Sequence, residues 1–395
     1  MRPSAPEPGS ARTRFLIAYV TKHIGDLVLM LPMIEALKRA HPDARLELAV
    51  QKSAASLLAA VPQVDRVWGL DVPGSGAKTR MEALRLSWDV TREYLKGMAD
   101  EAPPAVCIVP RWGDDGLRSS DVAYLMRASR RIGFEMKLLS DRLPFGEGTM
   151  TEQVAGGHGM QEASRGLYLL QSAGLLGEDE VPGSSERVIA SLRSIAERTD
   201  WNALADRVGL RPEERFGVIA PGATQARRRW PVDRWAEVGR LLQDAGLVVV
   251  VLSGADDAPV ARALQELLQA AESRGRSVVV AGVTTIAETV TLLAHSEIFL
   301  GADSGPGHLA GGLGVPTVVQ FIAAPGSDPD GSHSPERFRP VGPKVRCVQI
   351  PQTLEPCVGA CSSEEAHCIL TIGTETMLDA VRGLLMRGVG SGNRD

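Results

Sequence analysis

The sequence lacks three features that mark whole classes of protein: an excess of positive charge, a long apolar run and an even set of cysteines. The formal net charge is −5, which gives no reason to expect nucleic acid as a partner. No apolar run approaches the roughly 18–20 residues that span a bilayer, and residues 1–13 lack the apolar core of a signal peptide. Five cysteines disfavour a disulfide framework. We expect a cytoplasmic protein with a disordered tail at residues 1–13, and peripheral contact with the inner face of the membrane stays open.

What is present is a chain of 395 residues with ordinary hydrophobic and charged content, long enough for two domains. Apolar runs alternate with amphipathic stretches in both halves, as in βαβ units. We therefore predict the α/β class, with two Rossmann-like doubly wound domains facing a central cleft. The expected parts are an N-terminal domain (14–185), a linker region (186–212), a second domain (213–373) with a cysteine-rich loop (347–368), and a C-terminal helix and tail (374–395).

The most informative segment runs from Asp303 to Val315. It follows the apolar run 298–302 and leads into a helix of small residues. A strand that turns at once into a helix presents backbone N–H groups at the positive end of the helix, which suits a phosphate. Asp303 and Ser304 add capping and hydroxyl-binding oxygens, and His308 falls about one turn into the helix. A capped helix with a core histidine is the plainer alternative, but the strand–turn–helix context favours an anion site.

Two further loops follow the first strand of each half. His23-Ile24-Gly25-Asp26 lacks the G-x-G-x-x-G pattern of a dinucleotide site, and its Asp26 is either a helix cap or a general base at the cleft. The loop 221–231 carries a hydroxyl at Thr224 and the guanidinium groups of residues 227–229. These arginines form a solvated surface run or a diphosphate clamp, and their place between a strand and a helix start favours the clamp.

These segments together resemble the bacterial ADP-heptose:lipopolysaccharide heptosyltransferase family, glycosyltransferase family 9. The resemblance rests on Ile24 to Val28 with Pro32, the loop 221–231 and Asp303 to Ala310, with Arg131 to Phe134 between them. It spans roughly residues 15–385. It implies a GT-B fold, with an acceptor-binding first domain and a nucleotide-sugar-binding second domain. It also implies inverting transfer of a heptose or related sugar from an ADP-activated donor to an acceptor hydroxyl, with no cofactor required for catalysis.

The resemblance also implies roles for single residues. Asp26 would be the catalytic base, and His23 and Gly25 would form its loop on the acceptor side. The expected donor-binding residues are Thr224, Arg228, Asp257, Asp303, Ser304, Gly305 and His308. Arg228 stands where the family usually has lysine, so its contact with phosphate would differ in geometry. Asp256 and Asp257 are both candidates for the ribose, and helix capping explains either one equally well.

Four cysteines crowd near the C-terminus: Cys347, Cys357, Cys361 and Cys368. They match the ligand count of a tetrahedral thiolate site, and His367 offers an alternative ligand. The resemblance includes a branch that modifies autotransporter adhesins and carries a four-cysteine iron site. Reduced thiols in a long loop are the alternative, and between zinc and iron the sequence does not choose.

Other functions remain open at this stage. A GT-B sugar-nucleotide epimerase or hydrolase would need no acceptor, a protein (adhesin) heptosyltransferase would transfer to a serine, and a non-catalytic nucleotide-sugar-binding partner would not turn over. The acceptor is a glycolipid, a protein or a small molecule. It would contact the loops 73–78, 112–119 and 143–158, where Arg118, Arg127 and His158 are candidate anion contacts. The sequence does not indicate the oligomeric state.

Overall fold

The structure is a computed structural model that describes residues 13–21, 23–72, 79–113, 118–135, 149–177, 185–270, 275–358 and 363–389. The chain divides into two compact units. The first contains residues 1–22, 33–157 and 165–182, and the second contains residues 23–32, 158–164 and 183–395. Within the described ranges, no helix is long and apolar enough to cross a membrane.

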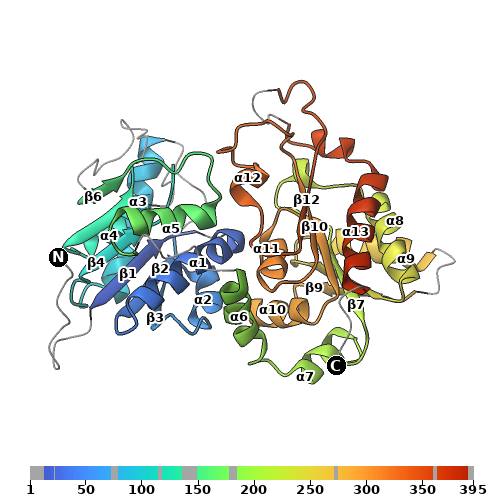
Figure 1. The fold of residues 1–395 in the computed structure, drawn as a ribbon, viewed down its shortest axis with the longest axis horizontal. Coiled ribbons are helices and arrows are strands. Elements are labelled where there is room, and N and C mark those ends of the chain that lie inside the picture. The colour runs from blue at the N-terminus through green and yellow to red at the C-terminus, as the bar shows by residue number, and fades with distance from the viewer. Residues whose placement is uncertain are drawn as a thin grey trace. The chain divides into compact units, whose positions relative to one another are not determined.

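The first unit is built on a six-stranded parallel sheet. Its strands are β1 (Arg14–Tyr19), β2 (Arg45–Gln51), β3 (Arg66–Leu70), β4 (Val106–Val109), β5 (Arg130–Phe134) and β6 (Glu152–Val154). Its helices are α1 (Ile24–Ala40, shared with the second unit), α2 (Ala55–Ala59), α3 (Arg80–Gly97), α4 (Ser119–Leu125) and α5 (Glu162–Ser172). The central strands are almost uniformly apolar and buried, as expected where helices cover both faces of a parallel sheet (Figure 1).

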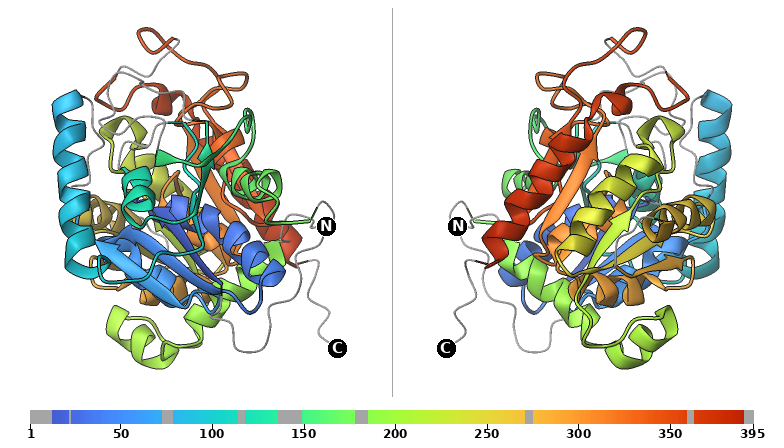
Figure 2. Two further views of the ribbon diagram at one scale, coloured as in Figure 1. Left: turned by 90° about the vertical axis from the view of Figure 1, so that its left-hand side faces the viewer. Right: turned by 90° about the vertical axis from the view of Figure 1, so that its right-hand side faces the viewer.

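The second unit repeats this plan around another six-stranded parallel sheet. Its strands are β7 (Phe216–Ala220), β8 (Val248–Ser253), β9 (Ser277–Ala281), β10 (Ile298–Ala302), β11 (Thr317–Phe321) and β12 (Val345–Gln349). Its helices are α6 (Ser185–Ala196), α7 (Trp201–Val208), α8 (Val232–Asp244), α9 (Ala258–Ala270), α10 (Ile286–Ala294), α11 (Gly305–Gly312), α12 (Pro335–Phe338) and α13 (Thr374–Val389). Helices α8, α9 and α13 pack on one face of the sheet, where Figure 2 shows them side by side. Helix α11 packs on the other face, against Phe299 and Val319.

Both sheets have the same strand order. The first runs β3-β2-β1-β4-β5-β6 and the second runs β9-β8-β7-β10-β11-β12, read from the other edge. In each sheet the order reverses beside the first strand, between β1 and β4 and between β7 and β10. Ligands of such sheets bind outside the carboxyl ends of the strands at that point. The loops that follow β7 and β10 are 221–231 and 303–304, and they carry four of the seven predicted donor-binding residues: Thr224, Arg228, Asp303 and Ser304.

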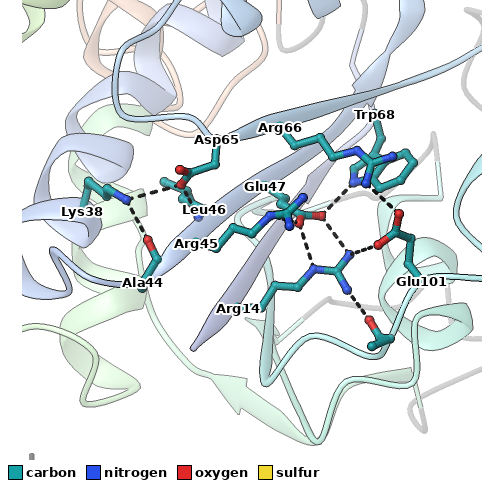
Figure 3. A network of polar contacts seen from close by, with 11 residues as sticks. Arg14, Lys38, Ala44, Arg45, Leu46, Glu47, Asp65, Arg66, Trp68 and Glu101 are labelled. Atoms are coloured by element: carbon teal, nitrogen blue, oxygen red, sulfur yellow. Dashed lines mark hydrogen bonds and ion pairs between the residues drawn. The ribbon is translucent and has the colours of Figure 1, made fainter. Parts of the chain in front are cut away.

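A polar network joins the amino ends of the first three strands (Figure 3). Glu47 on β2 is fully buried and accepts hydrogen bonds from Arg14 on β1, at 2.9 and 2.8 Å, and from the indole of Trp68 on β3, at 2.9 Å. Arg45 pairs with the same carboxylate at 2.7 Å. Burial alone would raise the pKa of Glu47, but the hydrogen bonds and the two guanidinium charges lower it. The network ties the strands together at the end of the sheet opposite the functional loops.

The structure departs from the sequence-based expectations at two sheet edges and in the linker region. Residues 143–157 were expected to be a loop, but their described part contains the edge strand β6. Cys347 was expected at the start of a loop and lies in the edge strand β12. Both strands are short and carry charged residues, so their apolar pattern is weak. The region 186–212 forms most of α6 and all of α7, whereas the acceptor loop 73–78 lies outside the described residues.

Candidate functional site

The centre of the site is a cluster of charged groups at the carboxyl end of β10. Asp303 directly follows that strand, and its carboxylate pairs with the guanidinium of Arg228 from the loop after β7. The Nε2 atom of His308 lies 3.4 Å from the other carboxylate oxygen. His308 is 3% exposed, so its ring is held in one place by the surrounding protein. Three of the predicted donor-binding residues are therefore in direct contact.

Asp303 is charged in spite of its burial. Desolvation raises the pKa of a buried carboxyl group, but here the hydrogen bond with His308 and the charge of Arg228 lower the pKa of Asp303 below its ordinary value. A buried carboxylate that is ionised and paired with arginine fixes the direction of the guanidinium fork. Asp303 therefore orients Arg228, whose side chain keeps 19% of its surface exposed.

The loop with Asp26 packs directly against this cluster, and residues 23–32 are accordingly part of the second unit. A Cβ atom placed on Gly25 would lie 2.6 Å from Cδ2 of His308, and one placed on Gly305 would lie 2.9 Å from Ile24. Only glycine permits these approaches. Asp26, the next residue, is partly exposed in the first turn of α1, and His23 is exposed before the helix begins.

The loop after β7 contributes a second ion pair. Arg229 donates to Asp257 at 2.9 Å, and a Cβ atom on Gly222 would lie 2.4 Å from the same carboxylate. Asp257 is thus brought onto the loop, whereas Asp256 is exposed. Thr224 is exposed at the turn of the loop.

His333 belongs to the same cluster and was missed by the sequence analysis. It lies in the segment after β11, more than 100 residues from the arginine run, and its Nε2 is 3.4 Å from Nη2 of Arg227. Burial and the charges of Arg228 and Arg227 lower the pKa of His333 to about 4, so its ring is neutral at pH 7. No local sequence pattern marks this residue, because only the fold brings it to the loop.

Several polar atoms around Asp303 are enclosed by protein and have no hydrogen-bond partner among the residues that the structure describes. They are Oγ of Ser304, Nδ1 of His308 and Nδ1 of His333. Ser304 does hold the N-cap position of α11, but its side chain makes no capping hydrogen bond, so our expectation of a capping oxygen there was wrong. Its hydroxyl is instead buried. Buried polar groups without a partner are rare in proteins, and each one calls for an explanation.

The cysteine-rich segment forms a separate cluster in the second unit. Cys357, His367 and Cys368 each offer a ligand atom within 4.8 Å of the others. Nδ1 of His367 lies 3.8 Å from Sγ of Cys357 and 3.4 Å from Sγ of Cys368. The structure does not place Cys347 in this group, since it lies on β12 near the charges of Arg339, Asp303 and Glu336. Cys361 lies outside the described residues.

Comparison with known proteins identifies the family. The model of glycosyltransferase family 9 (heptosyltransferase) matches residues 115–367, which is more than half of the chain. The chain is 23% identical over 311 residues to lipopolysaccharide heptosyltransferase 3 of Escherichia coli strain K12, covering 76% of this chain and 80% of that protein.

Solved structures show the same fold. A glycosyltransferase family 9 structure from Veillonella parvula has a TM-score of 0.69 at 17% identity, covering 96% of this chain and 99% of that one. The Escherichia coli heptosyltransferase WaaC, solved with ADP, has a TM-score of 0.66 at 16% identity, covering 94% and 99%. These structures confirm the expected GT-B class with two Rossmann-like domains. The expected resemblance is confirmed as well: the chain belongs to glycosyltransferase family 9, the heptosyltransferase family, and is a glycosyltransferase.

Proposed function

We propose that this glycosyltransferase moves a heptose, or a related sugar, from an ADP-activated donor to an acceptor hydroxyl with inversion at the anomeric carbon. The observation that carries the proposal is the contact of the Asp26 loop with His308 of the Asp303 cluster. The loop that carries Asp26 therefore touches the cluster that contains Arg228, and this contact supports a base and a diphosphate clamp in one site. The choice of donor is supported by the similarity to a lipopolysaccharide heptosyltransferase and to WaaC, a heptosyltransferase solved with ADP.

In this proposal Asp26 is the base. The acceptor oxygen attacks the anomeric carbon, the bond from that carbon to the diphosphate oxygen breaks, and Asp26 takes the hydroxyl proton. A carboxylate at the exposed start of a helix can reach a bound hydroxyl, and positioned proton acceptors of this kind contribute roughly 10²–10⁴-fold to rate. His23 and Gly25 shape the loop on which Asp26 lies.

The donor side stabilises the leaving diphosphate. Its negative charge grows as the glycosidic bond breaks, and preoriented positive groups stabilise this charge without reorganising. Arg228 is oriented by Asp303 for that role, with Thr224 and the start of α11 at Ser304 and Gly305 as further contacts. Asp257 is the candidate for the ribose.

The acceptor would be a glycolipid of the lipopolysaccharide core, bound by the first unit, at the inner face of the membrane. This assignment rests on the similarity to lipopolysaccharide heptosyltransferases. It predicts that lipopolysaccharide from a strain lacking this protein is shorter by at least one sugar. An unchanged core in such a strain, with loss of heptose from a protein instead, would contradict it.

Titration with ADP, UDP and GDP, followed by assay of Asp26→Asn, tests the donor and the base. We expect micromolar binding of ADP alone, with binding of ADP unchanged and turnover lost in the variant. The matched control is Asp233→Asn, which removes a carboxylate from the first turn of α8 and should leave both unchanged. Preference for UDP or GDP would overturn the donor, and activity close to wild type in Asp26→Asn would overturn the base.

We also propose that Cys357, His367 and Cys368 hold a zinc or iron ion with a structural role. In a tetrahedral site with metal–sulfur and metal–nitrogen distances of about 2.3 and 2.1 Å, neighbouring ligand atoms lie about 3.5–3.8 Å apart. The sulfur–nitrogen distances of 3.4 and 3.8 Å are close to that spacing. Cys361 remains the candidate fourth ligand. No step of the transfer reaction depends on this ion.

Metal analysis of protein purified without added metal tests this second proposal. We expect about one equivalent in the wild type and a marked loss in Cys368→Ser, whereas Cys107→Ser, which removes a buried thiol of the first unit, should retain the metal. Less than a tenth of an equivalent in the wild type would contradict the proposal.

A further inference from the structure

Helix α3 of the first unit carries large apolar side chains on two opposite sides. The side that packs on the unit is buried at Leu86, Val90 and Tyr94, which belong to the core cluster. The opposite side is open to solvent, although the outer face of a helix is ordinarily polar. Its four large apolar residues, between 42% and 75% exposed, form what we call the outer stripe: Met81, Leu84, Trp88 and Leu95.

The outer stripe is continuous along the helix. Its members are separated by three, four and seven positions, and these spacings return to the same side of an α-helix. The stripe extends about 21 Å along the axis, at about 1.5 Å per residue. Figure 2 shows α3, in light blue, on the outside of the first unit. Among the helices that the structure describes, only α3 has more than one exposed large apolar side chain.

Three exposed cations line one flank of the outer stripe: Arg85, Arg92 and Lys96. The acidic groups near them lie deeper, because the side chains of Asp89 and Glu93 are only 10% and 9% exposed. Their cationic partners Arg92 and Lys96 are 51% and 61% exposed. The exposed acid of α3, Glu82, is engaged in the capping box at the start of the helix. The outer layer of α3 is therefore apolar and cationic.

This combination fits the surface of an anionic bilayer. Helices that lie in the membrane interface place Trp and Leu at the boundary of the lipid chains and Lys and Arg at the head groups. Anionic head groups attract clustered cations. A second copy of the chain fits less well: the stripe offers roughly 500 Å², at about 200 Å² for each partly exposed side chain, whereas a stable protein interface takes about 800 Å² from each partner.

We propose that α3 is a membrane-docking surface. It lies in the interface of an anionic bilayer, with the outer stripe at the lipid chains and the three cations at the head groups. The docking surface deepens the proposed function, on which it rests for a lipid-borne acceptor. Helix α3 follows β3 and so begins at the carboxyl-end edge of the first sheet, where ligands of such sheets bind. Docking by α3 therefore brings that edge of the first unit close to the lipid.

Cosedimentation of the full chain with unilamellar vesicles tests the docking. We expect binding to vesicles of equal parts phosphatidylcholine and phosphatidylglycerol to be about tenfold tighter than to phosphatidylcholine alone, and this preference should fade as salt screens the charges. The double variant Trp88→Ser/Leu95→Ser should bind both kinds of vesicle at least about tenfold more weakly. Arg85→Gln/Arg92→Gln should lose the preference for the anionic vesicles.

Two further variants sharpen the test. Trp88→Phe keeps a large apolar side chain, so it should bind within about threefold of wild type but lose most of the blue shift of tryptophan fluorescence that vesicles cause. Leu267→Ser is the matched control, because it removes a 39% exposed leucine from α9 of the second unit and should bind vesicles as the wild type does. Thermal unfolding checks that each variant is folded.

Several outcomes would overturn the docking surface. They are a wild type that binds neither kind of vesicle, a double variant that binds as the wild type does, and a wild-type dimer that the double variant dissociates and that ignores vesicles. The last outcome would assign the stripe to a second copy. Titration with ADP separates this proposal from the proposed function, since the α3 variants should keep wild-type affinity for ADP. Loss of vesicle binding with ADP binding intact overturns the docking surface alone, whereas vesicle binding without binding of ADP, UDP or GDP overturns the proposed function.

Discussion

The close approach of Gly25 to His308 makes Gly25→Ala the most direct test of how the site is built. The added methyl group would lie 2.6 Å from Cδ2 and 2.9 Å from Nε2 of the imidazole, well inside ordinary van der Waals distance. His308 is 3% exposed, so the ring cannot move into solvent. The methyl group must therefore displace either the ring or the start of α1.

The size of the effect follows from two opposing terms. Overpacking a well-packed site costs roughly 1–3 kcal/mol, and alanine in place of glycine in a helix gains at most about 1 kcal/mol. The gain is small here because Gly25 is the second residue of α1. We expect a net loss of about 1–2 kcal/mol, which lowers Tm by about 1–3 °C in a protein of this size. Displacing His308 also disturbs its contact with Asp303, so we expect ADP affinity to fall about tenfold.

Thermal unfolding and calorimetric titration with ADP measure both effects. Gly383→Ala is the matched control, because Gly383 lies in α13 and, apart from its chain neighbours and the backbone of its own helix, no atom of the described residues lies within 4 Å of an added methyl group. It should leave ADP affinity unchanged and Tm equal or slightly higher. If Gly25→Ala keeps both the stability and the ADP affinity of the wild type, the packing of the Asp26 loop on His308 does not shape the site.

Four further predictions address other parts of the protein. Glu47→Gln should lower the free energy of unfolding at pH 7 by about 2–3 kcal/mol, because the buried carboxylate holds two arginines. Folding lowers the pKa of Glu47, so the stabilising effect of its charge is present above about pH 4.5 and is lost as the pH falls further. The Tm values of variant and wild type should therefore converge in acid. Arg228→Lys keeps the positive charge and loses the planar fork of the guanidinium group, so we expect weaker ADP binding with measurable turnover. Turnover equal to wild type in Arg228→Ala would show that this side chain is dispensable. Burial raises the pKa of Cys107 to about 12 and that of Cys347 to about 11, so iodoacetamide at pH 8 should leave both unmodified in the folded protein, as read by mass spectrometry of the peptides. Removal of the proposed metal ion by a chelator should lower Tm and weaken ADP binding. The link is the indole of Trp230, beside the arginine run, which donates at 3.0 Å to the carbonyl of Ile372, just after the turn that contains Cys368. A chelated protein with unchanged ADP affinity would show that the cysteine cluster and the loop are independent.

The sequence determined the local features of this protein. Uniform apolar runs such as 298–302, each followed by a loop and a helical pattern, indicated parallel sheets, and β10 and α11 were found where they were expected. The order of the three loop segments was enough to indicate the family, because each motif is contained in a few consecutive residues. The cysteines near the C-terminus were visible by spacing alone.

The tertiary structure decided which of these features meet. Arg228 and Asp303 are 75 residues apart, and His333 is 106 residues from Arg227. They meet because the carboxyl ends of the parallel strands, and the loops that follow them, lie at the same end of the sheet. The same argument applies to the cysteines: spacing suggested Cys347 as a ligand, but β12 holds it away from the group of Cys357, His367 and Cys368. A side chain's neighbours across a sheet depend on strand order and register, which are set by long-range packing and are not encoded in any local stretch of the chain.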